Sequence, residues 1–317
     1  MLLDQPGLGK TNSAIYLAEE LKAQKGLQHC LIICGVNTLK ANWEKEIIKF
    51  SNLSCRILGK RVNRKGNISY ASVKERAAEL MHPIDEFFII TNIETIRSED
   101  IVQALRTTKN KIDMVVMDEA HKVSNSSMQG KNMLKLNRYR YKIALTGTLI
   151  LNNPLSAYGP LKWIGVEHAN LTTFKSQYCV FGGFGGHQII GYKNLDILKQ
   201  EIESCSLRRL KSDMKDLPPK IVINEVIEMD DKHRKFYDAV KDGIKEECNK
   251  VILDANNTLA LTTRLRQATA CPSILTTENI ISSKVQRAID LVEELCAAGE
   301  KVVIMSVFKE TLNVLMD

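Results

Sequence analysis

The chain has 317 residues, of which 44% are hydrophobic and 26% charged, and its formal net charge is +7. This composition predicts a soluble globular protein that buries a sizeable core and makes two domains. No signal peptide or apolar run of membrane-spanning length is present, which argues against secreted and membrane proteins. The eight cysteines contain no C-x-x-C pair and predict reduced thiols in the cytosol or nucleus. The positive charge suits a polyanionic partner, although many basic enzymes have none.

The segment Asp4-Gln5-Pro6-Gly7-Leu8-Gly9-Lys10-Thr11 has the composition of a loop that binds nucleotide phosphates. Its glycines allow backbone N–H groups to turn inward around a phosphate, its lysine supplies charge for the β- and γ-phosphates, and its threonine hydroxyl can ligate Mg²⁺. The predicted nucleotide-binding residues are Gly7, Leu8, Gly9, Lys10 and Thr11. Asp4 stands where the common pattern has glycine, and a glycine-rich turn before a helix is the alternative interpretation.

Apolar spacing places this loop between a strand and a helix. Leu2-Leu3 predicts the end of a strand, and the periodicity over residues 12–25 predicts a helix that stops at Gly26. Further short apolar runs predict strands buried on both faces of a parallel sheet. These runs are Cys30–Cys34, Phe87–Thr91, Met114–Met117 and Tyr141–Leu145. Helical segments between them, including residues 38–50 with Trp43 expected in the core, predict the α/β class.

Asp118-Glu119-Ala120-His121 follows the third of these runs. The carboxyl end of a central strand is where α/β sheets place their ligand chemistry. Asp118 can hold Mg²⁺, and Glu119 can orient and deprotonate an attacking water. Without a phosphate loop in the same sheet, such a pair would be interpreted as a helix cap. Thr146-Gly147-Thr148 follows the next run, and its hydroxyls can couple the nucleotide site to motion elsewhere.

Two other stretches each have two interpretations. Residues 59–67 carry four positive charges and no acid, which fits a solvated surface loop or a contact with a phosphate backbone. Residues 181–186 predict a hairpin-like turn whose phenylalanines either pack or stack on bases. The histidines other than His121 form no ligand-like cluster, so we expect no zinc.

In their order along the chain, Asp-x-x-Gly-Leu-Gly-Lys-Thr, Asp-Glu-Ala-His and Leu-Thr-Gly-Thr resemble the helicase-like motors of superfamily two. Residues 31–46 resemble the second motif of their SWI/SNF-type (sucrose-nonfermenting) branch, and residues 145–154 resemble its third, with Leu149 where proline is usual. Residues 207–220, with Leu-Arg-Arg-x-Lys and Leu-Pro-x-Lys, look like a marker specific to that branch. Residues 174–194 are most similar to the annealing-helicase relatives and their bacterial and phage counterparts.

The resemblance implies a RecA-like parallel sheet of the P-loop NTPase type, followed by a helical insertion and the start of a second RecA-like domain. The implied boundaries are 1–155 for the ATP-binding domain, 156–215 for the insertion and hinge, and 216–317 for the second domain. In this last part, the residues themselves predict an extended run over 221–227, a charged helix over 230–253 and a helix over 283–298. The resemblance adds a first strand within 301–306.

The resemblance also implies an ATP-dependent translocase that moves along double-stranded DNA, remodelling what is bound to it or annealing strands. Such a protein would act in a bacterial or phage-infected cytoplasm, or in the nucleus of a eukaryote. Lys10, Asp118 and Glu119 would carry out hydrolysis of ATP, with Mg²⁺ held by Thr11 and Asp118. The residues that would link hydrolysis to DNA movement are His121, Thr146, Gly147 and Thr148. The residues that either pair with acids at the hinge or contact DNA are Arg208, Arg209 and Lys211.

The chain departs from the family at both ends. Only three residues precede Asp4, and no counterpart of the family's arginine-bearing motif is found, so we expect a piece of a larger protein. Loss of an arginine finger costs about a thousandfold or more in turnover. One alternative is therefore a nucleotide- or DNA-binding module that needs a partner chain for the missing motor half. Another is a DEAH-box RNA helicase, which shares the Asp-Glu-Ala-His box but not the marker at 207–220.

Overall fold

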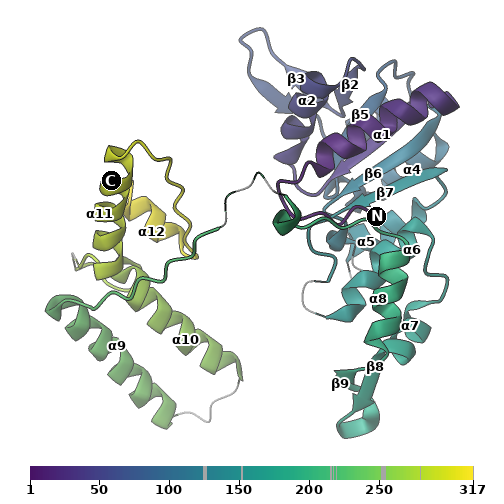
Figure 1. Ribbon diagram of the computed structural model, residues 1–317. Helices are drawn as coiled ribbons and strands as arrows, with labels where there is room; N and C mark the ends of the chain where they lie inside the picture. The colour runs from purple at the N-terminus through teal and green to yellow at the C-terminus, as the bar shows by residue number, and fades with distance from the viewer. Residues whose placement is uncertain are drawn as a thin grey trace. The chain divides into compact units, whose positions relative to one another are not determined.

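The computed structural model describes residues 1–123, 127–150, 153–214, 216, 218, 220–250, 255–278 and 280–316. The chain divides into two compact units, Met1–Pro218 and Pro219–Asp317 (Figure 1). Residues 156–215, which the resemblance sets apart as a helical and loop insertion with the hinge, lie in the first unit. No helix of the described residues is long and apolar enough to cross a membrane.

A five-stranded parallel sheet forms the centre of the first unit, as the apolar runs predict. Its strand order is β2-β5-β1-β6-β7. The strands are β1 (His29–Cys34), β2 (Cys55–Ile57), β5 (Phe88–Asn92), β6 (Ile112–Asp118) and β7 (Tyr141–Leu145). The N-terminal Leu2 adds a parallel bridge to Leu145 of β7 and another to Leu207. The predicted α/β class is therefore confirmed, and the first residues of the chain extend the sheet beyond β7.

Both faces of this sheet are buried, because alternate residues of each central strand pack into different cores. In β1, Leu31 and Ile33 belong to one apolar cluster, whereas Cys30, Ile32 and Cys34 belong to the other. Helices α1 (Lys10–Lys25) and α2 (Leu39–Phe50) cover the second cluster. The helices that cover the first are α3 (Val73–Leu80), α4 (Glu99–Thr107), α5 (Met128–Lys135) and α6 (Tyr158–Ile164).

A third apolar cluster attaches the remaining helices to the sheet. Phe174 of α7 (Leu171–Tyr178) and Leu198 of α8 (Leu195–Ser204) pack with Leu3 and Leu149. This shared core explains why these helices belong to the same unit as the sheet. The intervening hairpin, β8 (Cys179–Gly182) and β9 (Gln188–Tyr192), encloses the turn η4 (Phe184–Gly186), where a hairpin-like turn is predicted.

Residues 59–67, predicted as a loop, form the first strand and the turn of a hairpin that ends at Tyr70. Strands β3 (Lys60–Val62) and β4 (Ile68–Tyr70) pair antiparallel, with Gly66 at a φ of 80° in the turn between them. The Lys60 ammonium lies 2.6 Å from a Glu44 oxygen, and the Arg61 guanidinium lies 2.8 Å from Glu75. Acids from neighbouring helices therefore neutralise part of a stretch that contains none itself.

The second unit is helical in its described residues. Its helices are α9 (Asp231–Lys250), α10 (Ala255–Ala270), α11 (Ser283–Ala297) and α12 (Lys309–Val314), with the short turn η6 (Pro272–Ile274). The expected strand within 301–306 is wrong: no strand is assigned among the described residues of this unit. Val303 and Met305 are 79% and 88% exposed. A strand needs a hydrogen-bonded neighbour, and none of the described residues of this unit provides one.

Several predicted positions lie outside the described residues. These are Leu151 and Asn152 of the third motif, Leu217 and Pro219 of the marker, and residues 251–253 of the predicted charged helix.

Candidate nucleotide-binding site

Three loops meet at the carboxyl edge of the sheet. The phosphate loop connects Leu3 to α1, Asp118 ends β6, and Thr146-Gly147-Thr148 follows β7. Because parallel strands end at the same edge, loops more than 100 residues apart in the chain lie together there. A Cβ on Gly147 would lie 3.1 Å from Cδ of Pro6, so the loop after β7 packs directly on the phosphate loop.

The phosphate loop has the backbone shape that its glycines permit. Gly7 and Gly9 have φ values of 88° and 77°, in the region that side chains disfavour. The Lys10 ammonium donates to the carbonyl oxygens of Asp4 (2.7 Å) and Gln5 (3.3 Å). Helix α1 starts at Lys10, so its free N–H groups and positive dipole end adjoin the loop.

Asp4, the position that departs from the common pattern, is completely buried and paired with Arg209. The Arg209 Nε and backbone N–H donate to the two carboxylate oxygens at 2.9 and 2.8 Å, and Nη2 makes a further short contact. Burial alone would raise the pKa of Asp4, but the hydrogen bonds from Arg209 outweigh it and the pKa is lowered. Arg209 thus holds the base of the phosphate loop, which fits the predicted pairing with an acid.

A side chain of helix α2 makes a hydrogen bond to Asp118. The indole N–H of Trp43, a completely buried side chain, donates to Oδ2 of Asp118 at 3.0 Å. Burial raises the pKa of Asp118, whereas the Trp43 hydrogen bond and the nearby Lys10 charge oppose that rise. The carboxylate is therefore fixed in orientation at the end of β6.

Glu119 adopts a left-handed backbone conformation, with φ 53° and ψ 50°. This conformation costs a non-glycine residue about 1–3 kcal/mol and occurs preferentially at functional sites. Gly35, just after β1, makes room for the side chain: a Cβ there would lie 2.6 Å from Cβ of Glu119. The Lys122 ammonium donates to the Gly35 carbonyl oxygen at 2.7 Å and ties the same two loops together.

A hydrogen-bond chain joins Glu119 to the loop after β7. His121 Nδ1 lies 3.2 Å from Oε2 of Glu119 and 3.0 Å from Oγ1 of Thr146. The Thr146 hydroxyl donates to the Thr148 carbonyl oxygen (3.1 Å) and accepts from the Thr148 N–H (3.2 Å). The Thr146 hydroxyl proton is donated to the Thr148 carbonyl oxygen, and the Glu119 carboxylate can only accept a hydrogen bond. The proton between these groups is therefore assigned to Nδ1 of His121. This hydrogen bond is the main reason why the pKa of Glu119 is lowered.

The structure therefore brings together most of the residues predicted for the site. Lys10, Asp118, Glu119, His121, Thr146 and Thr148 form a continuous set, with Gly147 against Pro6. Arg208 is exposed, and it makes no side-chain hydrogen bond or ion pair with any described residue. Lys211 lies beside the phosphate loop rather than paired with an acid.

The sequence did not predict three features of this candidate site. Trp43 is expected only to pack, although a buried indole N–H needs an acceptor and an Asp is a suitable one. Gly35 carries no local signal, because its φ is not positive and only the nearness of Glu119 excludes a side chain. The Asp4–Arg209 pair joins residues 205 positions apart, which no spacing rule covers.

Comparison with known proteins places this site in a family. A model of the SNF2-related domain matches residues 1–274. The chain is 26% identical to an uncharacterized ATP-dependent helicase of Mycoplasma genitalium, over 99% of this chain and 28% of that protein. It is 28% identical to chromodomain-helicase-DNA-binding protein 8 of Danio rerio, over 76% of this chain and 9% of that protein. The chain thus spans less than a third of the length of either of these two relatives.

A solved structure has the same fold. The Sulfolobus solfataricus SWI2/SNF2 ATPase core in complex with double-stranded DNA aligns with a TM-score of 0.53 at 23% identity, covering 99% of this chain and 64% of that chain. The parallel sheet with helices on both faces is accordingly RecA-like. Since the family model covers residues 1–274, the chain belongs to the SNF2-related domain family.

Proposed function

We propose that this chain is the ATP-hydrolysing part of a motor that translocates along double-stranded DNA. The observation that carries the proposal is the hydrogen-bonded chain from Glu119 through His121 to Thr146, in the loop after β7 that packs on the phosphate loop. Such a path lets groups that act on a phosphate move a loop at the sheet edge. Membership in the SNF2-related family and the names of its helicase and chromodomain relatives support the same function.

The residues present fit a magnesium–nucleotide complex. The loop glycines Gly7 and Gly9 have the positive φ values of a phosphate-binding loop, Lys10 supplies the cation, and Thr11 follows it in the first turn of α1. Thr11 and Asp118 would hold Mg²⁺, which supplies positive charge to the phosphates. Glu119, whose pKa is lowered, stays ionised at neutral pH and can accept the proton of an attacking water.

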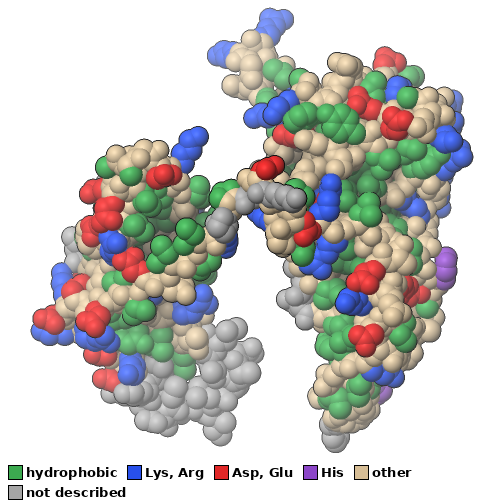
Figure 2. Space-filling model, viewed as in Figure 1, with side chains coloured by type: hydrophobic (Ala, Val, Ile, Leu, Met, Phe, Trp, Pro, Cys, Tyr) green, Lys and Arg blue, Asp and Glu red, His purple; other side chains and the backbone are tan. Residues whose placement is uncertain are grey.

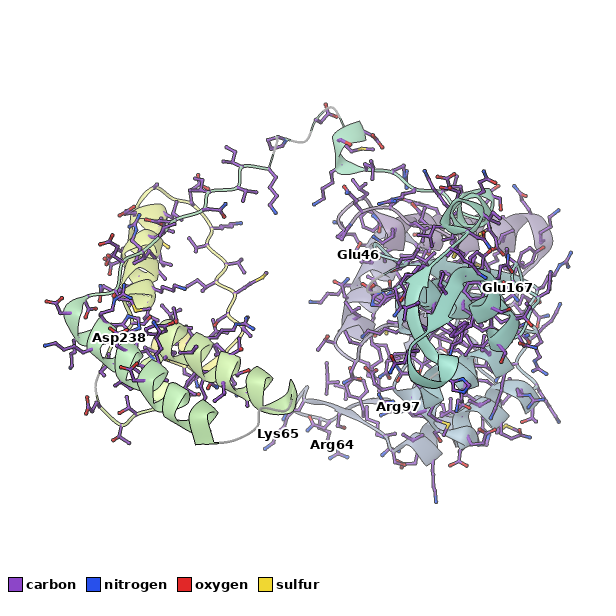
Figure 3. All side chains as sticks on the ribbon, turned by 90° about the horizontal axis from the view of Figure 1, so that it is seen from below. Glu46, Arg64, Lys65, Arg97, Glu167 and Asp238 are labelled. Carbon is purple, nitrogen blue, oxygen red and sulfur yellow. The ribbon has the colours of Figure 1, made fainter. Side chains whose placement is uncertain are left out.

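Two observations support double-stranded DNA as the track of this motor. The chain has a net charge of +7, and its fold resembles that of a SWI2/SNF2 ATPase core in complex with double-stranded DNA. The clearest candidate contact is the tip of the β3–β4 hairpin. The side chains of Arg64 and Lys65 point away from the rest of the unit there (Figure 3), and blue side chains stand out at this tip in the space-filling view (Figure 2). Neither side chain has an acidic partner among the described residues. We further propose that the protein acts inside the cell, in the cytoplasm or nucleus.

The test is steady-state ATP hydrolysis by the full chain with and without double-stranded DNA, beside Lys10→Ala and Glu119→Gln. We expect DNA to stimulate turnover, Lys10→Ala to lose nucleotide binding, and Glu119→Gln to bind nucleotide but hydrolyse about 10²- to 10⁴-fold more slowly. Normal hydrolysis by Glu119→Gln would contradict the general-base assignment.

A chain that binds ATP but does not turn over, even with DNA, would overturn the motor proposal and support a nucleotide-binding module. Stimulation by RNA but not by DNA would support the RNA-helicase alternative.

A further inference from the structure

The segment that leads out of the first unit runs alongside the start of the chain. Residues 207–209 pair in parallel with residues 1–5, on the side opposite β7 (Figure 1, green beside purple). The backbone hydrogen bonds of this ladder join Leu207 N to Met1 O (3.0 Å), Leu3 N to Leu207 O (2.7 Å) and Gln5 N to Arg209 O (3.2 Å). The phosphate loop is therefore attached to β7 on one side and to the exit segment on the other.

This pairing determines where the side chains of the exit segment lie. The extended conformation continues to Leu210 (φ −105°, ψ 155°), and Lys211 begins the short turn η5 (Lys211–Asp213). Arg209 holds Asp4 at the start of the loop. Two residues after Arg209, the backbone N–H of Lys211 donates to Oε1 of Gln5, the next residue of the loop, at 2.7 Å. A Cβ on Gly7 would lie 3.9 Å from both Cε and Nζ of Lys211, so the ammonium group lies against the loop itself.

The Lys211 ammonium has no acidic partner among the described residues. Asp213, the nearest acid in the sequence, accepts instead from the backbone N–H of Leu210 (2.8 Å) and from the Ser212 hydroxyl. The loop thus carries two lysine side chains, Lys10 at the start of α1 and Lys211 from the exit segment. Two ammonium groups beside one glycine-rich loop suit a polyanion such as a triphosphate.

We propose that Lys211 is a second phosphate-binding lysine of the nucleotide site. The inference rests on the proposed function, because it assigns a further residue to the same ATP site. It differs from both sequence-based interpretations of Lys211, pairing with an acid at a hinge or contacting DNA. Lys211 belongs to the last residues of the first unit, which ends at Pro218.

The test measures binding of the non-hydrolysed analogue AMP-PNP with Mg²⁺ by calorimetry, using the full chain and its Lys211→Ala and Lys211→Arg variants. Loss of one charge-assisted contact predicts about tenfold or more weaker binding by Lys211→Ala, with the difference shrinking as salt is raised. Lys211→Arg keeps the charge and should retain most of the affinity. Lys199→Ala, an exposed lysine on α8, is the matched control and should bind as the wild type does.

Thermal unfolding separates a phosphate contact from a structural role. The backbone hydrogen bond to Gln5 survives in Lys211→Ala, so Tm without nucleotide should not change, whereas the rise in Tm caused by AMP-PNP should be smaller. A lower Tm without nucleotide in both Lys211→Ala and Lys211→Arg, together with equal losses of binding, would overturn the inference in favour of a structural role.

If Lys211→Ala binds AMP-PNP as tightly as the wild type while Lys10→Ala binds it more weakly, the inference about Lys211 is overturned and the proposed ATP site stands. Absence of nucleotide binding by the wild-type chain would overturn the proposed function and this inference with it.

Discussion

The indole N–H of Trp43 donates a hydrogen bond to Oδ2 of Asp118, across 75 residues of sequence. Trp43 lies on α2 and Asp118 ends β6, so the helix that follows β1 fixes the orientation of a carboxylate on the neighbouring strand. Both groups are largely withdrawn from water, where a hydrogen bond to a charged group contributes more than at the surface.

Replacing Trp43 by Phe keeps an aromatic ring in the core and removes the N–H donor. The pKa of Asp118, already raised by burial, should rise further because the hydrogen bond that opposes the rise is lost. Magnesium-dependent hydrolysis should then weaken more at pH 6 than at pH 8, and the free energy of unfolding should fall by about 1.5–3 kcal/mol. Trp163→Phe is the control, because its indole donates to the Leu136 carbonyl oxygen, not to Asp118; an equal pH effect there would contradict the assignment.

Gly35→Ala should displace Glu119. The new Cβ would lie 2.6 and 2.7 Å from Cβ and Cγ of Glu119, too close for either residue to stay in place. A displacement of about 1 Å in a catalytic group lowers kcat by about 10²-fold, while nucleotide affinity should change little. Single-turnover hydrolysis and calorimetry measure the two quantities separately. Gly243→Ala, where a Cβ meets nothing within 4 Å, should leave kcat unchanged.

His121→Ala should shift the acid side of the pH–rate profile. Glu119 must be ionised to act as a base, and its pKa is lowered mainly by the hydrogen bond from His121. Without this bond the pKa of Glu119 rises, so activity should be lost at a higher pH as the solution is acidified. His121→Asn places an N–H donor near the position of Nδ1 and should restore part of the original profile. An unshifted acid limb in His121→Ala would mean that Glu119 is not the titrating base.

The Asp4–Arg209 pair should make stability depend on pH. The pKa of Asp4 is lowered in the folded state, so the pair stabilises the protein above the ordinary carboxyl pKa, and this contribution is lost as pH falls through the lowered value. Arg209→Ala leaves a buried, unpaired carboxylate, whose pKa should then be raised by burial. The loss of stability in Arg209→Ala should therefore be large at pH 7 and shrink towards pH 4, as measured by urea unfolding. Arg208→Ala, on an exposed neighbour, should show no such pH trend.

The hairpin tip can be tested by the salt dependence of DNA binding. Each phosphate contact in duplex DNA contributes about 0.9 to the slope of log K against log salt. Removing both charges in the double variant Arg64→Ala/Lys65→Ala should reduce the slope by about 1 to 2 for any duplex sequence. An unchanged slope, equal to that of Lys199→Ala, would mean that the hairpin tip is simply solvated.

The prediction succeeds where the signal is local. Continuous apolar runs identify the central strands because residues buried on both faces must all be apolar, and the observed β7 (Tyr141–Leu145) has the predicted limits. The run at 301–306 has the same apolar character but forms no strand among the described residues, since a strand depends on a partner elsewhere. The helix after the phosphate loop begins at Lys10, two residues earlier than expected, because the loop glycine Gly9 serves as its N-cap.

The sequence by itself determined which residues make up the candidate site: a loop of glycines with Lys10 and Thr11, and an acidic pair after a buried run. These follow from residue types and from neighbours a few positions apart. Only the tertiary structure decided that Trp43 holds Asp118, that Arg209 holds Asp4, and that Lys211 lies on the phosphate loop. The physical reason is that these contacts depend on strand order and on the pairing of residues 1–5 with 207–209, and such long-range packing leaves no periodic trace in the sequence.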